Sequence, residues 1–188
     1  NAVIDGYVKS SYNDIGKPIQ KPNHSWNAVK IDNNWIYIDA TWGAGHQSNG
    51  KWFRKFKPYF FNIPKDLYFK THLPEDSYWI LKVGSMNKTT FYNQPIYSER
   101  FLNTAYKLTK PTSGFLKKEK NGEITVVLKN IDPSQKIHFA FLSEKFAKPA
   151  TVSTSKDTIK ASIIPPKKTT HAFLMIDLEV MIYLKILK

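Results

Sequence analysis

The sequence predicts an α+β fold, with an antiparallel sheet within residues 1–83 and an immunoglobulin-like β-sandwich over residues 84–188. Residues 24–42 contain two runs of β-branched and aromatic residues around a polar break, the pattern of a β-hairpin. Beyond residues 83–85, short apolar runs alternate with turn residues, which is typical of an antiparallel sandwich. The sandwich is predicted only in general plan, because it has no Cys–Trp–Cys signature.

The predicted hairpin turns at residues 32–33, an Asp-Asn pair in which both residue types tolerate positive φ. With a two-residue turn, Trp26 faces Asp39 and His24 faces Thr41. His24 and Asp39 are then diagonal neighbours on one face, about 7–8 Å apart at the backbone and within side-chain reach. A three-residue loop would put them on opposite faces instead, since a slip of one residue inverts a strand. The short turn therefore predicts an imidazole held against a carboxylate.

The other elements of the first part follow from local composition. Residues 1–8 are predicted as a strand, and residues 10–23, with Gly16, Pro18 and Pro22, as a long loop that leads to His24. The remaining predictions are a loop at 43–50, a further strand of the same sheet at 59–62, a short helical turn at 64–67 and an extended segment that crosses the core at 71–79.

The second part is predicted to be almost entirely strands. Residues 95–108 are ambiguous and are interpreted as a connector in which Phe101 and Leu102 are buried. Turn chemistry separates the apolar runs that follow it. The predicted strands are 124–128, 137–142, 151–153, 158–163, 171–178 and 182–187.

Composition excludes several classes of function. The 188 residues contain no Cys, which excludes disulfides and thiolate metal sites within them, and no apolar run is long enough to span a membrane. The formal charge is +13, with 11 basic and 7 acidic residues in 1–83 and 17 and 8 in 84–188. Because the lysines are scattered and Arg occurs only at Arg54 and Arg100, a solvated lysine-rich surface is favoured over a nucleic-acid site.

Two stretches carry a resemblance to a known family. The first is His-Ser-Trp-Asn-Ala-Val-Lys-Ile from residue 24, followed after the turn by Trp-Ile-Tyr-Ile-Asp-Ala-Thr-Trp-Gly from residue 35. It resembles the His and Asp segments of the transglutaminase-like superfamily of papain-like thiol enzymes. Pro-Tyr-Phe-Phe at residues 58–61 and Thr-His-Leu-Pro at residues 71–74 are similar to the kyphoscoliosis-peptidase-like branch. The resemblance covers about the first 80 residues well and the rest loosely.

The resemblance implies that residues 1–83 are the C-terminal portion of a papain- or transglutaminase-like core with a Cys-His-Asp triad. The family's nucleophile is a Cys on a helix upstream of residue 1, and this chain has no Cys. The chain is therefore expected to be a fragment that is inactive by itself. The implied chemistry of the intact protein is acyl transfer at peptide or glutamine amides, and peptidase and transamidase activity both remain open. A non-catalytic module that binds a protein or polymer is the alternative.

The resemblance gives His24 the role of general base and acid, and Asp39 the role of orienting it. Trp26 and His46 are expected to line the substrate cleft, while His72 is interpreted first as structural packing. No His cluster with metal-ligand spacing is evident, so neither a metal nor a cofactor is expected. A protein or peptide substrate is the expected partner. Many bacterial members of the family are exported, which favours an exported or cell-surface location, and the oligomeric state is left open.

Overall fold

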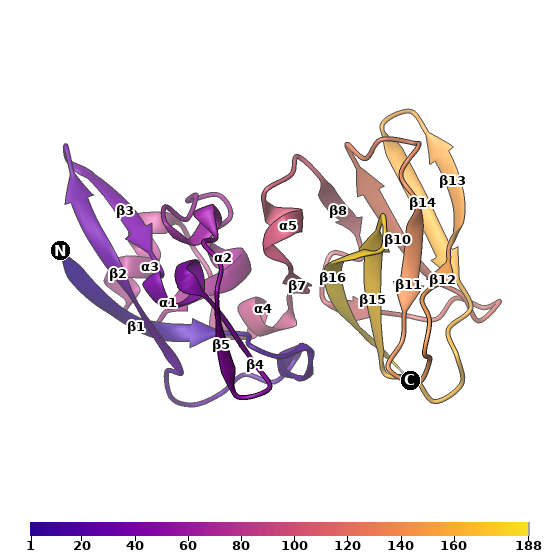
Figure 1. The fold of residues 1–188 in the computed structure, drawn as a ribbon, viewed down its shortest axis with the longest axis horizontal. Helices are drawn as coiled ribbons and strands as arrows, with labels where there is room; N and C mark the ends of the chain where they lie inside the picture. The colour runs from indigo at the N-terminus through magenta and orange to yellow at the C-terminus, as the bar shows by residue number, and fades with distance from the viewer. Residues whose placement is uncertain (188) are drawn as a thin grey trace. The chain divides into compact units, whose positions relative to one another are not determined.

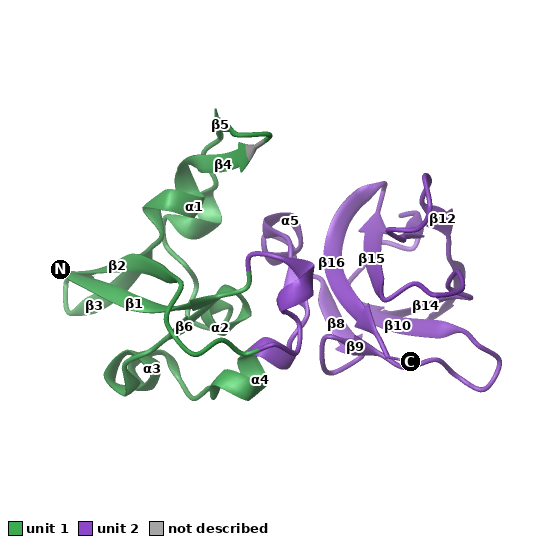
Figure 2. Ribbon diagram, turned by 90° about the horizontal axis from the view of Figure 1, so that it is seen from below, with its two compact units in different colours: residues 1–9, 18–91 green, residues 10–17, 92–188 purple. Residues whose placement is uncertain are grey.

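The computed structural model describes residues 1–187, and the chain divides into two compact units. Unit 1 contains residues 1–9 and 18–91, and unit 2 contains residues 10–17 and 92–188 (Figure 2). The sequence analysis places a boundary between two domains at residues 83–84, and this boundary stays a prediction. No helix among the described residues is both long and apolar enough to cross a membrane.

Unit 1 is built on an antiparallel sheet of four strands in the order β3-β2-β1-β6 (Figure 1, with β6 labelled in Figure 2). The strands are β1 (Ala2–Val8), β2 (His24–Ile31), β3 (Asn34–Ile38) and β6 (His72–Pro74). β1 lies between β2 and β6, so it brings the start of β2 and the start of β6 to the same end of the sheet. This placement brings two residues that lie 48 positions apart in the chain, His24 and His72, into one neighbourhood.

The predicted two-residue turn of the hairpin is confirmed. Ile31 pairs with Asn34, and the two residues between them, Asp32 and Asn33, have φ of 46° and 65°. These are the positive values that a tight hairpin turn requires. The prediction that the second strand runs to residue 42 is wrong, because β3 ends at Ile38 and α1 (Ala40–Ala44) begins directly after it.

Short helices and one hairpin complete unit 1. The prediction of a strand at 59–62 is wrong, because a 3₁₀ turn begins at Pro58. Proline suits the first position of a helical turn, where the backbone N–H makes no hydrogen bond within the helix. The 43–50 loop is wrong in part, since β4 and β5 form a hairpin through Asn49-Gly50 that projects beyond α1 (Figure 2). The remaining bounds are η1 (Tyr12–Asp14, in unit 2), β4 (Gly45–Ser48), β5 (Lys51–Arg54), η2 (Pro58–Phe60), α2 (Tyr68–Thr71), α3 (Ser77–Val83) and α4 (Lys88–Asn93).

Two other predictions for unit 1 agree with the structure at least in part. The helical turn at 64–67 is present as a hydrogen-bonded turn, in which the Leu67 N–H donates to the Pro64 carbonyl over 3.0 Å, and α2 follows it from Tyr68. The extended segment at 71–79 is correct only through β6, since Asp76 caps the N-terminus of α3 by accepting a hydrogen bond from the Tyr78 N–H.

Unit 2 contains two antiparallel sheets around one core, as in a β-sandwich. One sheet has the order β13-β14-β10-β8 and the other β12-β11-β15-β16-β7, with β9 parallel to β16. Strand β10 alternates buried and partly buried residues, which is the pattern of a strand with one face in the core. The immunoglobulin-like plan stays a prediction. The elements are β7 (Ile96–Tyr97), α5 (Glu99–Leu102), β8 (Lys107–Lys110), β9 (Phe115–Leu116), β10 (Ile124–Lys129), β11 (Ile137–Ala140), β12 (Lys148–Pro149), β13 (Thr151–Ser155), β14 (Thr158–Ile163), β15 (His171–Ile176) and β16 (Glu179–Ile186).

The predicted strands of unit 2 are largely correct, and the burial of Phe101 and Leu102 is confirmed at 5% and 7% exposure. The predicted strand at 171–178 is too long. β15 ends at Ile176, and a turn follows in which Asp177 and Leu178 both have positive φ. Asp tolerates this conformation but Leu rarely adopts it, so Asp177 alone is only a weak turn signal.

Candidate functional site

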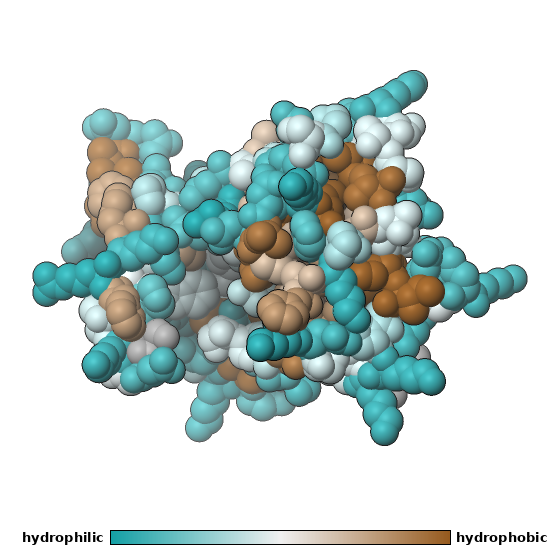
Figure 3. Space-filling model, turned by 45° about the vertical axis from the view of Figure 1, so that its right-hand side comes forward, coloured by the Kyte–Doolittle hydropathy of each residue, from teal (hydrophilic) through white to brown (hydrophobic). Residues whose placement is uncertain are grey.

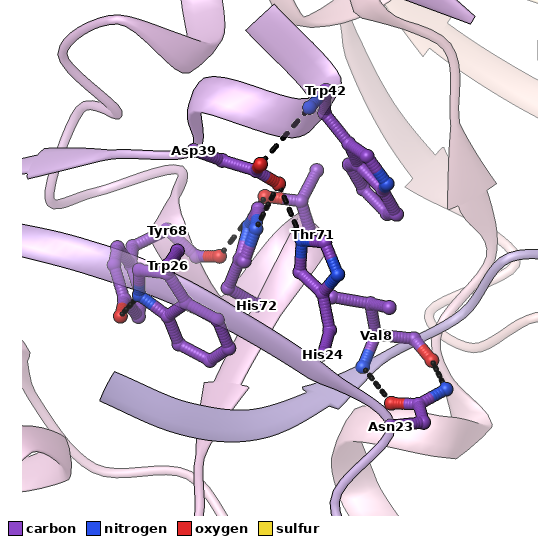
Figure 4. A network of polar contacts seen from close by, with 9 residues as sticks. All are labelled: Val8, Asn23, His24, Trp26, Asp39, Trp42, Tyr68, Thr71 and His72. Carbon is purple, nitrogen blue, oxygen red and sulfur yellow. Dashed lines mark hydrogen bonds and ion pairs between the residues drawn. The ribbon is translucent and has the colours of Figure 1, made fainter. Parts of the chain in front are cut away.

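Asp39 lies between a strand and a helix in unit 1. Its backbone N–H donates to the carbonyl of Phe60 over 2.8 Å, and its Oδ1 accepts the backbone N–H of Trp42 over 2.9 Å, which caps α1. The residue is only 1% exposed. One carboxylate oxygen is thus committed to the helix, and Oδ2 faces the side chains of β2 and β6 (Figure 4).

His24, the first residue of β2, is the nearer partner of that oxygen. Its Nε2 lies 2.7 Å from Asp39 Oδ2, and its side chain is 13% exposed. The preceding residue, Asn23, exchanges two side-chain hydrogen bonds of 3.0 and 3.1 Å with the backbone of Val8, which ties the loop to β1 (Figure 4). The Nδ1 of His24 makes no hydrogen bond within the described residues. The imidazole therefore has one nitrogen fixed and one available.

His72 is packed in the core, as the sequence interpretation expected, but its contact with Asp39 was not predicted. Its Nε2 lies 3.1 Å from the same Asp39 Oδ2, and its Nδ1 lies 2.8 Å from Thr71 Oγ1. The side chain is completely buried, and its ring meets the Trp26 ring edge to face at 4.7 Å. The signal available was the Thr-His-Leu-Pro motif, but a contact across 33 residues between Asp39 and His72 depends on how β6 pairs with β1.

Two opposed influences act on the pKa of Asp39. Burial is the largest single influence and raises it, but the hydrogen bonds from His24, His72 and the Trp42 N–H together outweigh burial. The pKa of Asp39 is therefore well below its ordinary value, and the group is an anion at neutral pH. An ionised carboxylate only accepts hydrogen bonds, so both histidines address it with a protonated Nε2.

Burial also dominates the pKa of His72 and lowers it from the ordinary value of 6.5, although Asp39 opposes this shift. His72 is therefore neutral at pH 7. In a neutral imidazole that carries its proton on Nε2, Nδ1 is an acceptor, and the Thr71 hydroxyl donates to it. The site at neutral pH consists of one anion held by a neutral buried histidine and by the partly exposed His24.

The same three residues meet the distance requirement for a metal site, which the sequence did not predict. The ligand atoms of His24, Asp39 and His72 all lie within 4.8 Å of one another. Two histidines and one carboxylate are a known ligand set for divalent metals. In the hydrogen-bonded arrangement each Nε2 donates to Asp39, so a cation bound by these atoms would displace both hydrogen bonds and require both histidines to carry their proton on Nδ1. The same donor set therefore serves either a hydrogen-bonded cluster or a cation, and the two arrangements exclude each other.

The two residues predicted to line the cleft lie in different surroundings. Trp26 is 2% exposed, and its Nε1 donates to the hydroxyl of Tyr68 over 2.7 Å. His46 lies on β4, where its ring stacks on Phe53 at 5.6 Å. Trp26 thus contacts the His24–His72 cluster from the core side, and no contact among the described residues joins His46 to that cluster. Their role in substrate binding stays a prediction.

An open pocket of about 640 Å³ lies beside His24 in unit 1. It gives the partly exposed imidazole access to solvent and to a ligand, which the fully buried His72 does not have. The other lining residues are Asp5, Pro22, Asn23, Ser25, Thr41 and Glu75.

Comparison with known proteins gives a distant likeness. No family model matches the chain. Kyphoscoliosis peptidase of Mus musculus is 23% identical over 171 residues, and that of Homo sapiens is 24% identical over the same length. Each alignment covers 89% of this chain and 25% of the relative, so the chain spans about a quarter of the length of these relatives. This likeness gives modest support to the resemblance predicted from the sequence.

Proposed function

We propose that unit 1 supplies the histidine and the carboxylate of a thiol-dependent acyl transferase or peptidase of the transglutaminase-like type. The observation that carries the proposal is the 2.7 Å contact between His24 Nε2 and Asp39 Oδ2, with Nδ1 left available beside an open pocket. A buried carboxylate that fixes one imidazole nitrogen and leaves the other for a nucleophile is the orienting part of a triad. The distant likeness to kyphoscoliosis peptidase points to the same chemistry.

In the proposed reaction, His24 Nδ1 takes the proton of a cysteine thiol, and the thiolate attacks the carbonyl carbon of a peptide or glutamine amide. The imidazolium then returns its proton to the departing amine or ammonia, and a thioester remains. Water or a second amine attacks the thioester, His24 accepts its proton, the C–S bond breaks, and His24 returns the proton to the departing sulfur. Asp39 stays ionised throughout and stabilises the imidazolium.

The thiol has to come from outside residues 1–188, because these contain no cysteine. The 188-residue chain is therefore expected to be inactive in acyl transfer when it is assayed alone. The same absence favours a second candidate, in which the fold serves as a non-catalytic module that binds a protein or polymer. In that case the pocket beside His24 would bind a ligand without transforming it.

The two candidates differ in the reactivity of one thiol. We expect rapid alkylation by iodoacetamide of a single cysteine in the natural protein that contains this chain, at mildly acidic pH, where ordinary thiols are protonated. His24→Ala should slow this labelling at least tenfold, because the thiolate loses its imidazolium partner. His138→Ala, on β11 of unit 2, is the matched control and should leave the rate unchanged. Labelling that is the same in the wild type and in His24→Ala would leave only the binding module.

A further inference from the structure

His72 is fully buried, and its Nε2 lies 3.1 Å from the Asp39 oxygen that His24 also contacts. We propose that His72 is a positioning residue, which holds the carboxylate of Asp39 in the orientation that His24 requires. Its catalytic meaning rests on the function proposed above, but its hydrogen bonds can be tested in this chain without any catalysis.

Three hydrogen bonds support this role: two connect Thr71 through His72 to Asp39, and the third connects His24 to the same Asp39 oxygen. The Thr71 hydroxyl donates to His72 Nδ1 over 2.8 Å, and His72 Nε2 donates to Asp39 Oδ2 over 3.1 Å. His24 Nε2 donates to that same oxygen over 2.7 Å. The ionised Asp39 accepts from His72 Nε2, which leaves Nδ1 as an acceptor, and a Thr71 hydroxyl that donates to Nδ1 favours the same tautomer from the other side of the ring. His72 therefore addresses Asp39 as a donor in one fixed tautomer.

The surroundings of His72 allow little movement. The side chain has no exposed surface, and the rings of Trp26, Trp42 and Phe60 lie 4.7, 5.3 and 6.2 Å from its own ring. Its backbone belongs to β6, where it is paired with Val8 of β1. Asp39 lies at the end of a strand, with only Oδ1 held by its own helix. A rigid donor on Oδ2 fixes the second oxygen and so the plane of the carboxylate.

A neutral donor suits this position better than a cation. A positively charged residue at His72 would cancel the charge of Asp39, and His24 would lose the negative partner that stabilises its imidazolium. Burial keeps His72 uncharged at neutral pH, so it orients the carboxylate and leaves its charge intact. This division of roles explains why one carboxylate oxygen has two imidazole partners with very different exposure, 13% and 0%.

The test is nuclear magnetic resonance of the 188-residue chain labelled with ¹⁵N-histidine. In the wild type we expect Nε2–H signals for both His24 and His72 at neutral pH. His72→Gln keeps a donor at the Nε2 position, and we expect the exchange of the His24 Nε2–H proton with water to stay within about threefold of the wild type. His72→Phe keeps the ring and removes the donor, and we expect this exchange to be at least tenfold faster, the factor of an ordinary charge-assisted hydrogen bond.

Each outcome decides the proposal. Equal exchange in the wild type and both variants would show that His72 only packs, and loss of the signal in both folded variants would show that ring shape matters and not the donor. If His72→Phe does not fold, Thr71→Val tests the same hydrogen bonds, since loss of the hydroxyl should weaken the preference of His72 for this tautomer. Stoichiometric binding of Zn²⁺ with loss of both Nε2–H signals would make the residues metal ligands and overturn the proposal.

The proposed function can fail separately. If alkylation of the thiol ignores His24 while the exchange data follow the expected order, the acyl-transfer function is wrong and the positioning by His72 stands. If His24 controls alkylation and His72→Phe alters neither alkylation nor proton exchange, the function stands and the positioning role is wrong.

Discussion

At the scale of single residues, one carboxylate oxygen organises the candidate site. Asp39 Oδ2 has both His24 and His72 as partners, and Oδ1 caps α1. A buried anion is stable only when such donors compensate for the loss of water. The same contacts that would orient a catalytic histidine therefore also stabilise the fold, so stability and function are linked at Asp39.

We predict that Asp39→Asn lowers the free energy of unfolding by about 3 kcal/mol at pH 7, the cost of breaking a buried charged network. The folded pKa of Asp39 lies below the ordinary value of 3.8, so its contribution is complete above pH 3.8 and is lost as the pH falls further. The difference between wild type and variant should therefore shrink below pH 4. Urea unfolding followed by circular dichroism from pH 7 down to pH 3 measures it.

Asp76→Asn is the matched control for that experiment. Asp76 also caps a helix by accepting a backbone N–H, but it is exposed and has no histidine partner. Asn caps as well as Asp, so the variant should unfold like the wild type within about 0.5 kcal/mol. A loss at Asp39 no larger than that at Asp76 would contradict the network.

The residue scale also shows what the sequence can reveal about the site. The turn register predicts that His24 approaches Asp39, and their contact is observed, while their catalytic role stays a proposal. The prediction placed Asp39 within the second strand of the hairpin, whereas in the structure Asp39 is the N-cap of α1 and contacts His24 from there. His72 was out of reach of the same reasoning, because periodicity within a segment says nothing about which distant strand pairs with β1.

At the scale of elements, β1 is the strand that aligns the site. It pairs with β2 on one side and β6 on the other, and Gly6 lies opposite both His24 and Pro74. A Cβ at Gly6 would meet the carbonyl oxygen of Leu73 at 2.3 Å and the Trp26 ring at 2.5 Å. The close approach of β6 and of Trp26 to β1 thus depends on a residue without a side chain.

We predict that Gly6→Ala destabilises the chain by about 1–3 kcal/mol, because the added methyl group overlaps backbone that cannot move freely. The strain should also push β6 away from β1, so the protection of the His72 Nε2–H from exchange should fall. Ala2→Gly, on the same strand at its outer end, is the control and should leave that signal unchanged. Thermal unfolding and the histidine spectrum measure both effects, and a fully stable Gly6→Ala with an intact signal would contradict this account of β1.

Two of the elements that the sequence interpretation missed have recognisable sequence patterns at their ends or turns. Asp39 before Ala-Thr-Trp is a helix N-cap pattern, and Asn49-Gly50 is the strongest short-range signal for a hairpin. The β-rich second part was easier to predict, because alternation of buried residues repeats along strands such as β10 and β11. Strands of two residues, such as β7 and β12, have no period to detect and are fixed only by their neighbours.

At the scale of the whole molecule, charge is the dominant property. The chain carries a formal charge of +13 at pH 7, and its sequence pI is about 9.7. On the face drawn in Figure 3, hydrophilic side chains surround separate hydrophobic patches. Three Lys or Arg ion pairs are present among the described residues, all of them on the surface: Arg100–Glu179, Lys129–Asp157 and Lys148–Glu144. Exposed pairs of this kind contribute little, so they do not offset the repulsion among the remaining lysines.

We therefore predict that salt stabilises the chain. Raising NaCl from about 10 mM to about 150 mM shortens the screening length from about 30 Å to about 8 Å, which weakens repulsion more than it weakens the few close pairs. The midpoint of thermal unfolding at pH 7 should rise by about 2–4 °C, equivalent to about 1 kcal/mol for a chain of this size.

Near pH 9.7 the net charge vanishes, and the same salt step should have little effect. The double variant Lys117→Glu/Lys118→Glu removes two positive and adds two negative charges at exposed positions, which lowers the net charge by four, and should reduce the salt response at pH 7. A midpoint that falls with salt at pH 7 would instead mean that attractive pairs dominate, and the basic surface would then have to be regarded as internally neutralised.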